Sequence, residues 1–168
     1  MRSSGEVLGL SASYGEAFYK AQEATQSKLP LEGTVLISVN RKDKEEIVEV
    51  AQMLHEDGFK IVATGGTCDI LNEAGIPAEK IKKLFEGRPN VLDAITNGKF
   101  DMIINSPIGK DSANDDSYLR KAAIKAKIPY MTTIAAAKAT AEGIRFVKAN
   151  SDSPIKSLQE LHAEIHDK

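Results

Sequence analysis

The segment VATGGTCDIL, residues 62–71, joins an apolar run to a pattern typical of a helix. The run at residues 59–63 has the hydrophobic character of a buried strand, and it ends abruptly in Thr64-Gly65-Gly66-Thr67. Because a helical pattern follows at once, these four residues lie where a strand passes into the N-terminus of a helix. Two glycines and two hydroxyl side chains there favour either an anion site or a plain tight turn with a threonine cap.

Strands and helices alternate on both sides of this junction. Apolar, β-branched runs predict strands at residues 34–39, 59–63, 81–84, 100–104 and 128–132. Helical spacing predicts helices at residues 14–26, 42–55, 67–73, 89–97, 116–127, 134–144 and 157–166. Short links between alternating elements favour an α/β fold of three layers, a mostly parallel sheet with helices on both faces.

The first thirty residues differ from the rest of the chain. They are irregular up to Leu10, and a capping box, Ser13 with Glu16, then opens a single helix. Residues 27–33, with Pro30 and Gly33, are typical of a linker. We therefore expect an arm at residues 1–31 and an α/β domain at residues 32–168.

Composition excludes several classes of function. The 168 residues carry a net charge of only −2 and show no basic block, so neither nucleic acid nor a membrane surface is expected as a partner. No apolar run reaches membrane-spanning length, and the N-terminus lacks the apolar core of a signal peptide. The single cysteine excludes an internal disulfide, and we expect a cytoplasmic protein.

Polar residues lie at or just beyond the end of every predicted strand. In an open parallel sheet, ligands bind beyond the carboxyl ends of the strands, so these residues are expected along one edge. Any one of them is typical of a solvated turn, but five sets on one edge favour a phosphate site, with asparagine available for a ribose or a base. The residues are Lys42, Lys44, Thr64, Thr67, Lys82, Lys83, Asn105, Ser106, Thr132 and Thr133.

These motifs resemble a known family. Ser38-Val39 with Lys44, the ATGGT loop, the segment KLFEGRP at residues 83–89, Ile103-Ile104-Asn105 and Thr132-Thr133 are similar to the methylglyoxal-synthase-like fold. They resemble more closely the C-terminal allosteric domain of the carbamoyl phosphate synthetase large subunit. The opening MRSSGEVLG is similar to the segment that leads out of the second synthetase domain, and the match extends over residues 1–162.

The resemblance implies a regulatory domain that binds UMP as an inhibitor and IMP weakly, in an enzyme of pyrimidine and arginine biosynthesis. It implies a phosphate site, ribose and base contacts from Asn105, and an ornithine contact from Thr132. We place Ser106 and Asp116 beside Asn105. Where the family often has a hydroxyl residue, this chain has Pro107, which would weaken UMP binding or change the preferred nucleotide. The phosphate-site residues are Lys44, Thr64, Gly66, Thr67 and Lys83.

The same resemblance implies the partners of the chain. They are the remainder of the large subunit and the glutaminase small subunit, and ATP, Mg²⁺ and K⁺ belong to the synthetase domains, so no cofactor is expected here. Apolar groups on the arm, with Phe18 and Tyr19 as candidates, predict self-association of the chain alone. Ornithine binding is expected to be weak or absent, because half of its site would lie in the neighbouring domain.

Methylglyoxal synthase, which eliminates phosphate from dihydroxyacetone phosphate, is the alternative. The resemblance implies an aspartate base and two histidines for that enzyme, and these positions hold Arg88, Asn40 and Ala113 here. Asp116 is the one carboxylate left, and an arginine cannot accept a proton at neutral pH. We therefore expect no catalytic residues. A third relative, the cyclohydrolase domain of a purine-pathway enzyme, shares the loop but has a different stretch at residues 85–90.

Three further features are expected to be structural. Cys68 has no histidine in the neighbouring motifs and is expected to fill the core. His162 and His166 have a metal-binding spacing but no third ligand nearby in sequence. The segment DSANDD at residues 111–116 lacks the glycine and closing glutamate of a calcium loop, so no metal site is expected.

Overall fold

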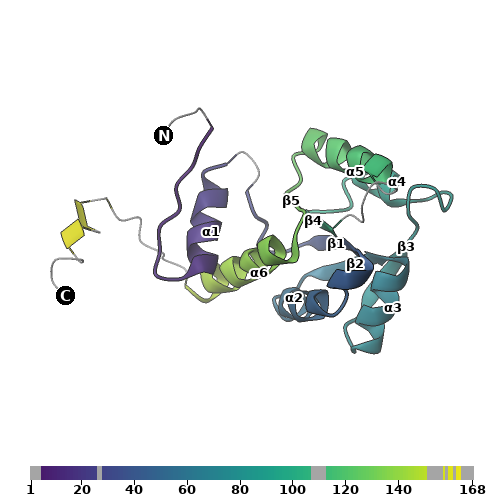
Figure 1. The fold of residues 1–168 in the computed structure, drawn as a ribbon, viewed down its shortest axis with the longest axis horizontal. Helices are drawn as coiled ribbons and strands as arrows, with labels where there is room; N and C mark the ends of the chain where they lie inside the picture. The colour runs from purple at the N-terminus through teal and green to yellow at the C-terminus, as the bar shows by residue number, and fades with distance from the viewer. Residues whose placement is uncertain are drawn as a thin grey trace.

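A parallel five-stranded sheet forms the centre of the molecule (Figure 1). The computed structural model describes residues 5–25, 28–106, 113–150, 157, 159–160 and 162–163, and side chains are described outside residues 113–116. The strand order is β3-β2-β1-β4-β5, and every pair of neighbours is parallel. The strands are β1 (Thr34–Val39), β2 (Lys60–Thr64), β3 (Ala78–Ile81), β4 (Met102–Ser106) and β5 (Tyr130–Met131).

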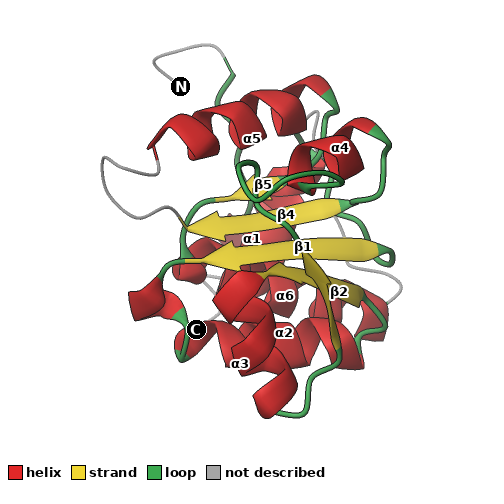
Figure 2. Cartoon of the chain, turned by 90° about the vertical axis from the view of Figure 1, so that its right-hand side faces the viewer, coloured by secondary structure: helices red, strands yellow, loops and turns green. Residues whose placement is uncertain are grey.

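Helices cover both faces of the sheet. Figure 2 shows α4 and α5 on one face and α2, α3 and α6 on the other, while α1 lies against α6. This is the three-layer arrangement that the alternating sequence pattern predicts. The helices are α1 (Tyr14–Glu23), the 3-10 turn η1 (Arg41–Asp43), α2 (Glu46–Glu56), α3 (Gly65–Glu73), α4 (Val91–Thr96), α5 (Ala113–Lys125) and α6 (Ile134–Ala149).

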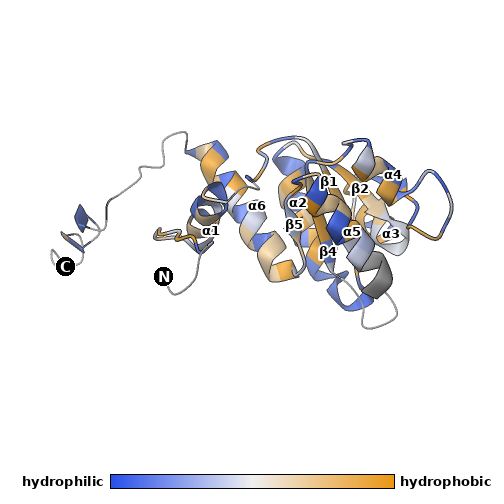
Figure 3. Cartoon of the chain, turned by 90° about the horizontal axis from the view of Figure 1, so that it is seen from above, coloured by the Kyte–Doolittle hydropathy of each residue, from blue (hydrophilic) through white to orange (hydrophobic). Residues whose placement is uncertain are grey.

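The core alternates with the pleat of the strands. In β1, Val35 and Ile37 face the larger cluster under α2, α3 and α6, whereas Leu36 faces the smaller cluster under α4 and α5. All three side chains are fully buried, which explains why this strand reads as a continuous apolar run. Figure 3 shows the apolar colouring gathered on the strands.

The chain order of the strands creates a switch point between β1 and β4. From β1 the chain adds β2 and β3 on one side of the sheet, and it then crosses to add β4 and β5 on the other. In open α/β sheets the crevice beyond the carboxyl ends of the strands at such a point is where ligands bind. Val39 pairs with Ser106 here, so both residues lie at this crevice.

Some predicted boundaries were wrong, and the third strand was misplaced most. It is Ala78–Ile81 rather than residues 81–84, and it lies at the edge of the sheet. An edge strand is half exposed, and this one carries the charged residues Glu79 and Lys80 in its middle. It therefore lacks the apolar run by which the buried strands were predicted. The helix α6 also continues to Ala149, five residues beyond its predicted end.

The arm packs onto the domain, which contradicts the predicted exposure of its aromatic residues. Tyr19 is only 8% exposed and belongs to the larger core cluster, and Phe18 is partly buried against it. At the centre of this contact, α1 and α6 meet at Gly15 and Gly143: a Cβ atom on Gly143 would lie 2.6 Å from the Gly15 carbonyl oxygen. The large apolar residues exposed on the described part of the arm are Val7, Leu8, Leu10, Tyr14 and Leu31.

The capping boxes are borne out to different extents. Ser13 accepts a hydrogen bond from the Glu16 N–H at the start of α1. Ser157 and Glu160 bond reciprocally: the Ser157 N–H donates to the Glu160 carboxylate over 2.6 Å, and the Glu160 N–H donates to Ser157 Oγ over 3.2 Å. Half of the predicted last helix, residues 158, 161 and 164–166, lies outside the described residues. Within the described part of the chain, no helix is long and apolar enough to cross a membrane.

Candidate ligand-binding site

The junction between β2 and α3 presents an open helix N-terminus at the carboxyl edge of the sheet. Thr64 is the N-cap residue of α3 but makes no side-chain cap, because its hydroxyl donates to Ser38 Oγ over 2.8 Å. Gly65 has a φ of +32°, which favours glycine, and Gly66 is exposed. The first N–H groups of a helix have no partner within it, so they and the positive end of the helix dipole are available to an anion.

Thr67 joins this helix to the end of β1. Its hydroxyl accepts a hydrogen bond from the Val39 N–H over 3.3 Å, and its side chain is buried. The hydroxyls of Thr64 and Thr67 therefore both bind the end of β1. In the Thr64–Ser38 pair one hydroxyl donates to the other, so one O–H of the two remains for a further acceptor.

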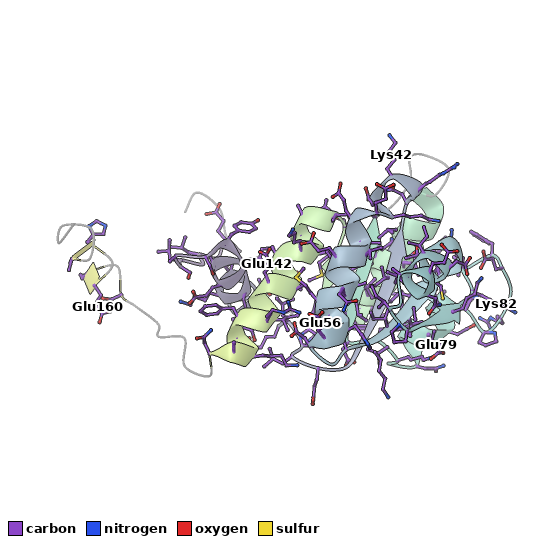
Figure 4. All side chains as sticks on the ribbon, turned by 90° about the horizontal axis from the view of Figure 1, so that it is seen from below. Lys42, Glu56, Glu79, Lys82, Glu142 and Glu160 are labelled. Atoms are coloured by element: carbon purple, nitrogen blue, oxygen red, sulfur yellow. The ribbon has the colours of Figure 1, made fainter. Side chains whose placement is uncertain are left out.

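Lys44 brings a positive charge to the same junction. It follows the turn η1 after β1, and its ammonium would lie 2.5 Å from a Cβ atom placed on Gly66. It makes no ion pair with any carboxylate in the described part of the chain. Lys42, in the same turn, points away from the molecule (Figure 4). The structure thus brings together Lys44 and the loop of residues 64–67, as the sequence predicts.

Asn40 is the centre of a hydrogen-bond network at the switch point, and the sequence analysis did not place it in the binding site. Its Oδ1 caps η1 by accepting from the N–H groups of Lys42 and Asp43, over 2.8 Å and 3.3 Å. Its Nδ2 donates to Asp43 and to Ser106 Oγ, over 2.6 Å and 3.2 Å. Its backbone N–H also donates to Ser106 Oγ, over 3.1 Å. The spacing of Asn40 and Asp43 is a cap signal that could have revealed this role.

Asn105 is buried beside Ser106, and a residue of the neighbouring strand β5 holds its side chain in place. Its Nδ2 and the Tyr130 hydroxyl are 2.6 Å apart, and the Arg120 guanidinium lies 6.0 Å from the centre of the Tyr130 ring. Tyr130 was not predicted as part of the site, because a pattern of strand residues does not distinguish it from its neighbours in the strand. Pro107 lies outside the described residues, as does the side chain of Asp116.

Lys83 and Thr132 lie at the ends of the outer strands. Lys83 is exposed, its N–H donates to Glu86 over 2.8 Å, and its ammonium makes no ion pair or hydrogen bond within the described residues. Lys82 is also exposed and is labelled in Figure 4. Thr132 is exposed just after β5, and Thr133 caps α6 by accepting from the Ala136 N–H. Within the described residues, no hydrogen bond or ion pair joins Lys83 or Thr132 to Lys44.

Arg88 occupies the position at which the resemblance implies a catalytic aspartate. Its guanidinium lies 3.4 Å from Asp93, and its side chain is largely exposed. Asp93 also accepts from the Asn90 N–H, in a capping box that opens α4. Within the described residues, no group of three side chains could hold a metal ion, and Cys68 is buried as expected.

A hollow of about 650 Å³ lies at the opposite end of the sheet. Thr34, Lys60 and Ala78, which begin β1, β2 and β3, contribute to its wall, and the ion pair of Lys99 with Glu79, 2.7 Å long, lies beside it. Parallel sheets bind ligands at the carboxyl ends of their strands rather than here. We therefore take the edge at Lys44 as the candidate site.

The fold and the donor-rich edge define an open α/β domain of the methylglyoxal-synthase type. Methylglyoxal synthase from Elizabethkingia anophelis NUHP1 aligns with a TM-score of 0.53 and 17% identity, over 65% of this chain and 76% of that one. Residues 46–132 match the family model of the MGS-like domain. The chain belongs to this MGS-like domain family.

Its homologues are large chains of carbamoyl phosphate synthase, which confirms the resemblance seen in the motifs. The C-terminal section of that chain from Methanopyrus kandleri is 46% identical over 163 residues, 96% of this chain and 30% of the relative. The large chain from Methanothrix thermoacetophila is 45% identical over 98% of this chain and 15% of the relative. That of Acidobacterium capsulatum is 46% identical over 97% and 15%. The chain thus spans less than a third of each of these relatives.

Proposed function

We propose that this chain is the regulatory domain of a carbamoyl phosphate synthase large chain and that it binds nucleoside monophosphates. The observation that carries the proposal is the position of the Lys44 ammonium over Gly66, beside the open N-terminus of α3. A free cation and unpaired backbone N–H groups at one point are the chemistry that binds a phosphate. The phosphate of UMP or IMP is the proposed occupant.

The rest of the nucleotide would extend toward the switch point. Asn105 and Ser106 lie there, at the end of β4, and Ser106 is bonded to the turn that precedes Lys44. We propose that these two residues, with Asp116, contact the ribose and the base. Lys83, in the loop of residues 82–90, is proposed to complete the phosphate site, since its ammonium makes no ion pair or hydrogen bond within the described residues.

Regulation would follow from linkage. A nucleotide that binds better to the low-activity form of the whole enzyme shifts the enzyme toward that form, by a coupling free energy of typically about 1–3 kcal/mol. The partners are then the remainder of the large chain, which would hold ATP, Mg²⁺ and K⁺, and the glutaminase subunit. The enzyme would serve pyrimidine and arginine biosynthesis in the cytoplasm. Thr132 would form part of an ornithine site shared with the neighbouring domain.

Calorimetric titration of UMP, IMP and dihydroxyacetone phosphate into the chain tests this proposal. We expect saturable nucleotide binding that Lys44→Ala weakens by about tenfold or more, the loss of a charge-assisted hydrogen bond. Lys42→Ala is the matched control, because that lysine leaves the same turn and points away (Figure 4). Lys83→Ala tests whether the loop contributes. Ornithine should not bind to the chain alone.

An assay for methylglyoxal on the same sample distinguishes the regulatory proposal from the alternative, a methylglyoxal synthase. Production of methylglyoxal that requires Lys44 would make the chain an enzyme and would overturn the regulatory proposal. Nucleotide binding that is equally strong in Lys44→Ala would show that the phosphate lies elsewhere.

A further inference from the structure

We infer that Asn40 is a positioning residue of the anion site, acting through Ser106 and Lys44 without touching the ligand. The inference rests on the proposed function, because it describes how the phosphate-binding groups are held. Asn40 lies between β1 and β4 at the switch point and bonds to groups on both sides of it.

The orientation of the Asn40 amide is fixed by its neighbours. The oxygen Oδ1 lies 2.8 Å and 3.3 Å from the N–H groups of Lys42 and Asp43, which can only donate. The nitrogen Nδ2 must therefore face Asp43 Oδ2, which accepts over 2.6 Å, and Ser106 Oγ. The reverse orientation would place an oxygen against a carboxylate and an NH₂ against two N–H donors.

This orientation determines what the Ser106 hydroxyl can do. A hydroxyl group has one hydrogen to donate and two lone pairs to accept with. Both N–H groups that Asn40 directs at Ser106 Oγ donate to it, over 3.1 Å and 3.2 Å, and they fill both lone pairs. Ser106 is left as a donor only, and no acceptor for its O–H lies among the described residues. A donor at this edge matches the oxygen of a phosphate or a ribose and disfavours a cation.

Asn40 also sets the position of Lys44. Its Oδ1 caps η1, and this turn leads directly to Lys44, whose ammonium lies over Gly66. Loss of the cap would release the turn and with it the lysine. Asn40 thus orients the Ser106 hydroxyl on β4 and positions the Lys44 ammonium after β1 for the same ligand.

Two substitutions separate these effects, with UMP and inorganic phosphate as the calorimetric probes. Asn40→Ser keeps an N-cap residue and the net charge, but its shorter side chain cannot cap the turn and reach Ser106 together. Asn40→Ala removes both the cap and the side-chain donation to Ser106, while the backbone N–H of residue 40 still donates. We expect Asn40→Ser to weaken UMP binding about tenfold in the otherwise unchanged chain and less than about twofold when Ser106 is already alanine. Asn40→Ala should lose more, and the excess should vanish when Lys44 is also alanine.

Asn97→Ser, at an exposed asparagine after α4, is the matched control and should bind like the unchanged chain. Equal losses in all backgrounds, accompanied by a fall in melting temperature, would mean that Asn40 only supports the fold and would overturn the inference. Unchanged affinity in Asn40→Ala would overturn it as well. If the unchanged chain binds neither probe, the proposed function fails first and this inference falls with it.

Discussion

At position 66, the ammonium of Lys44 occupies space that a side chain would otherwise enter. This contact explains why residue 66 is a glycine. The sequence alone left two explanations open, a tight turn and an anion site. The sequence did predict that the loop joins a strand to a helix, because an apolar run precedes it and a helical pattern follows. It could not predict that both threonine hydroxyls bind β1, since those bonds depend on strands brought together by the fold.

Substitution of Gly66 tests the relation with Lys44. Gly66→Ala should stabilise α3 slightly, by up to about 1 kcal/mol, because alanine is the better helix former. It should nevertheless weaken UMP binding about tenfold, because the new Cβ displaces the ammonium. Calorimetry on Gly66→Ala, Lys44→Ala and the double variant checks this. A further loss when Gly66→Ala is added to Lys44→Ala would show instead that the methyl group blocks the ligand.

Thr67→Val should reduce stability without changing the shape of the site. The valine keeps the volume but loses the acceptor for the Val39 N–H, which becomes unsatisfied at a half-buried position. We expect a loss of about 1–2 kcal/mol in the free energy of unfolding, measured in urea. Thr67→Ser retains the hydroxyl and should lose less, and the opposite order would contradict the role given to this bond.

At the scale of elements, burial decides how well each one could be predicted. Strands β1 and β2 lie inside the sheet and appear in the sequence as apolar runs. The predicted position of β3 was wrong because an edge strand with charged residues lacks that signal. Strand β5 contains only two residues of the run predicted for it. The docking of α1 on α6 was missed, because close contact of two glycines leaves no trace in a hydrophobic pattern.

The contact of α1 with α6 has a direct test. In Gly143→Ala, the added Cβ would lie 2.6 Å from the Gly15 carbonyl oxygen and 3.0 Å from Tyr19 Cβ. Backbone must therefore move, and we expect a loss of about 1–3 kcal/mol despite the better helix propensity of alanine. Thermal unfolding measures it. Ala135→Gly, at an exposed position of α6, shows the propensity effect alone, and increased stability in Gly143→Ala would contradict the close packing.

Arg145 fastens α6 to the end of α2. Its guanidinium donates to the Met53 carbonyl over 3.1 Å, to Glu56 over 2.8 Å and to Asp57 over 3.3 Å. Because the group is partly exposed and screened by water, we expect Arg145→Ala to lose about 1 kcal/mol. Urea unfolding checks this value. Lys138→Ala removes an exposed ion pair between the same helices and should lose less.

Replacing Arg145 should also change how the stability of the chain depends on pH. The Gln52 amide, and after it the Arg145 guanidinium, lowers the pKa of Glu56. A lowered pKa gives stability that is present above the ordinary carboxyl range and is lost as the pH falls through the lowered value. Stability should therefore fall less between about pH 6 and pH 3 in Arg145→Ala than in the unchanged chain. An identical acid dependence would show that Gln52 alone sets this pKa.

At the scale of the whole molecule, the arm presents apolar side chains that nothing within the described residues covers. Leu8 is 69% exposed and Tyr14 is 71% exposed. We expect the chain alone to self-associate through them at high concentration, and Leu8→Glu to abolish this in analytical ultracentrifugation. Ile124→Glu alters an exposed apolar residue on α5 and should have no effect. A strict monomer at high concentration would contradict the expectation.

The contact between Gly15 and Gly143 leaves no free space between α1 of the arm and α6. From Ile134, beside the ligand edge, to Gly143 the helix is about 14 Å long, so a tilt of about 5° would displace Gly143 by about 1 Å. There is no free space at a contact where even a methyl group does not fit, and α1 must follow. We therefore expect a tilt of α6 toward α1, imposed by a nucleotide bound near Thr133, to displace the arm as well.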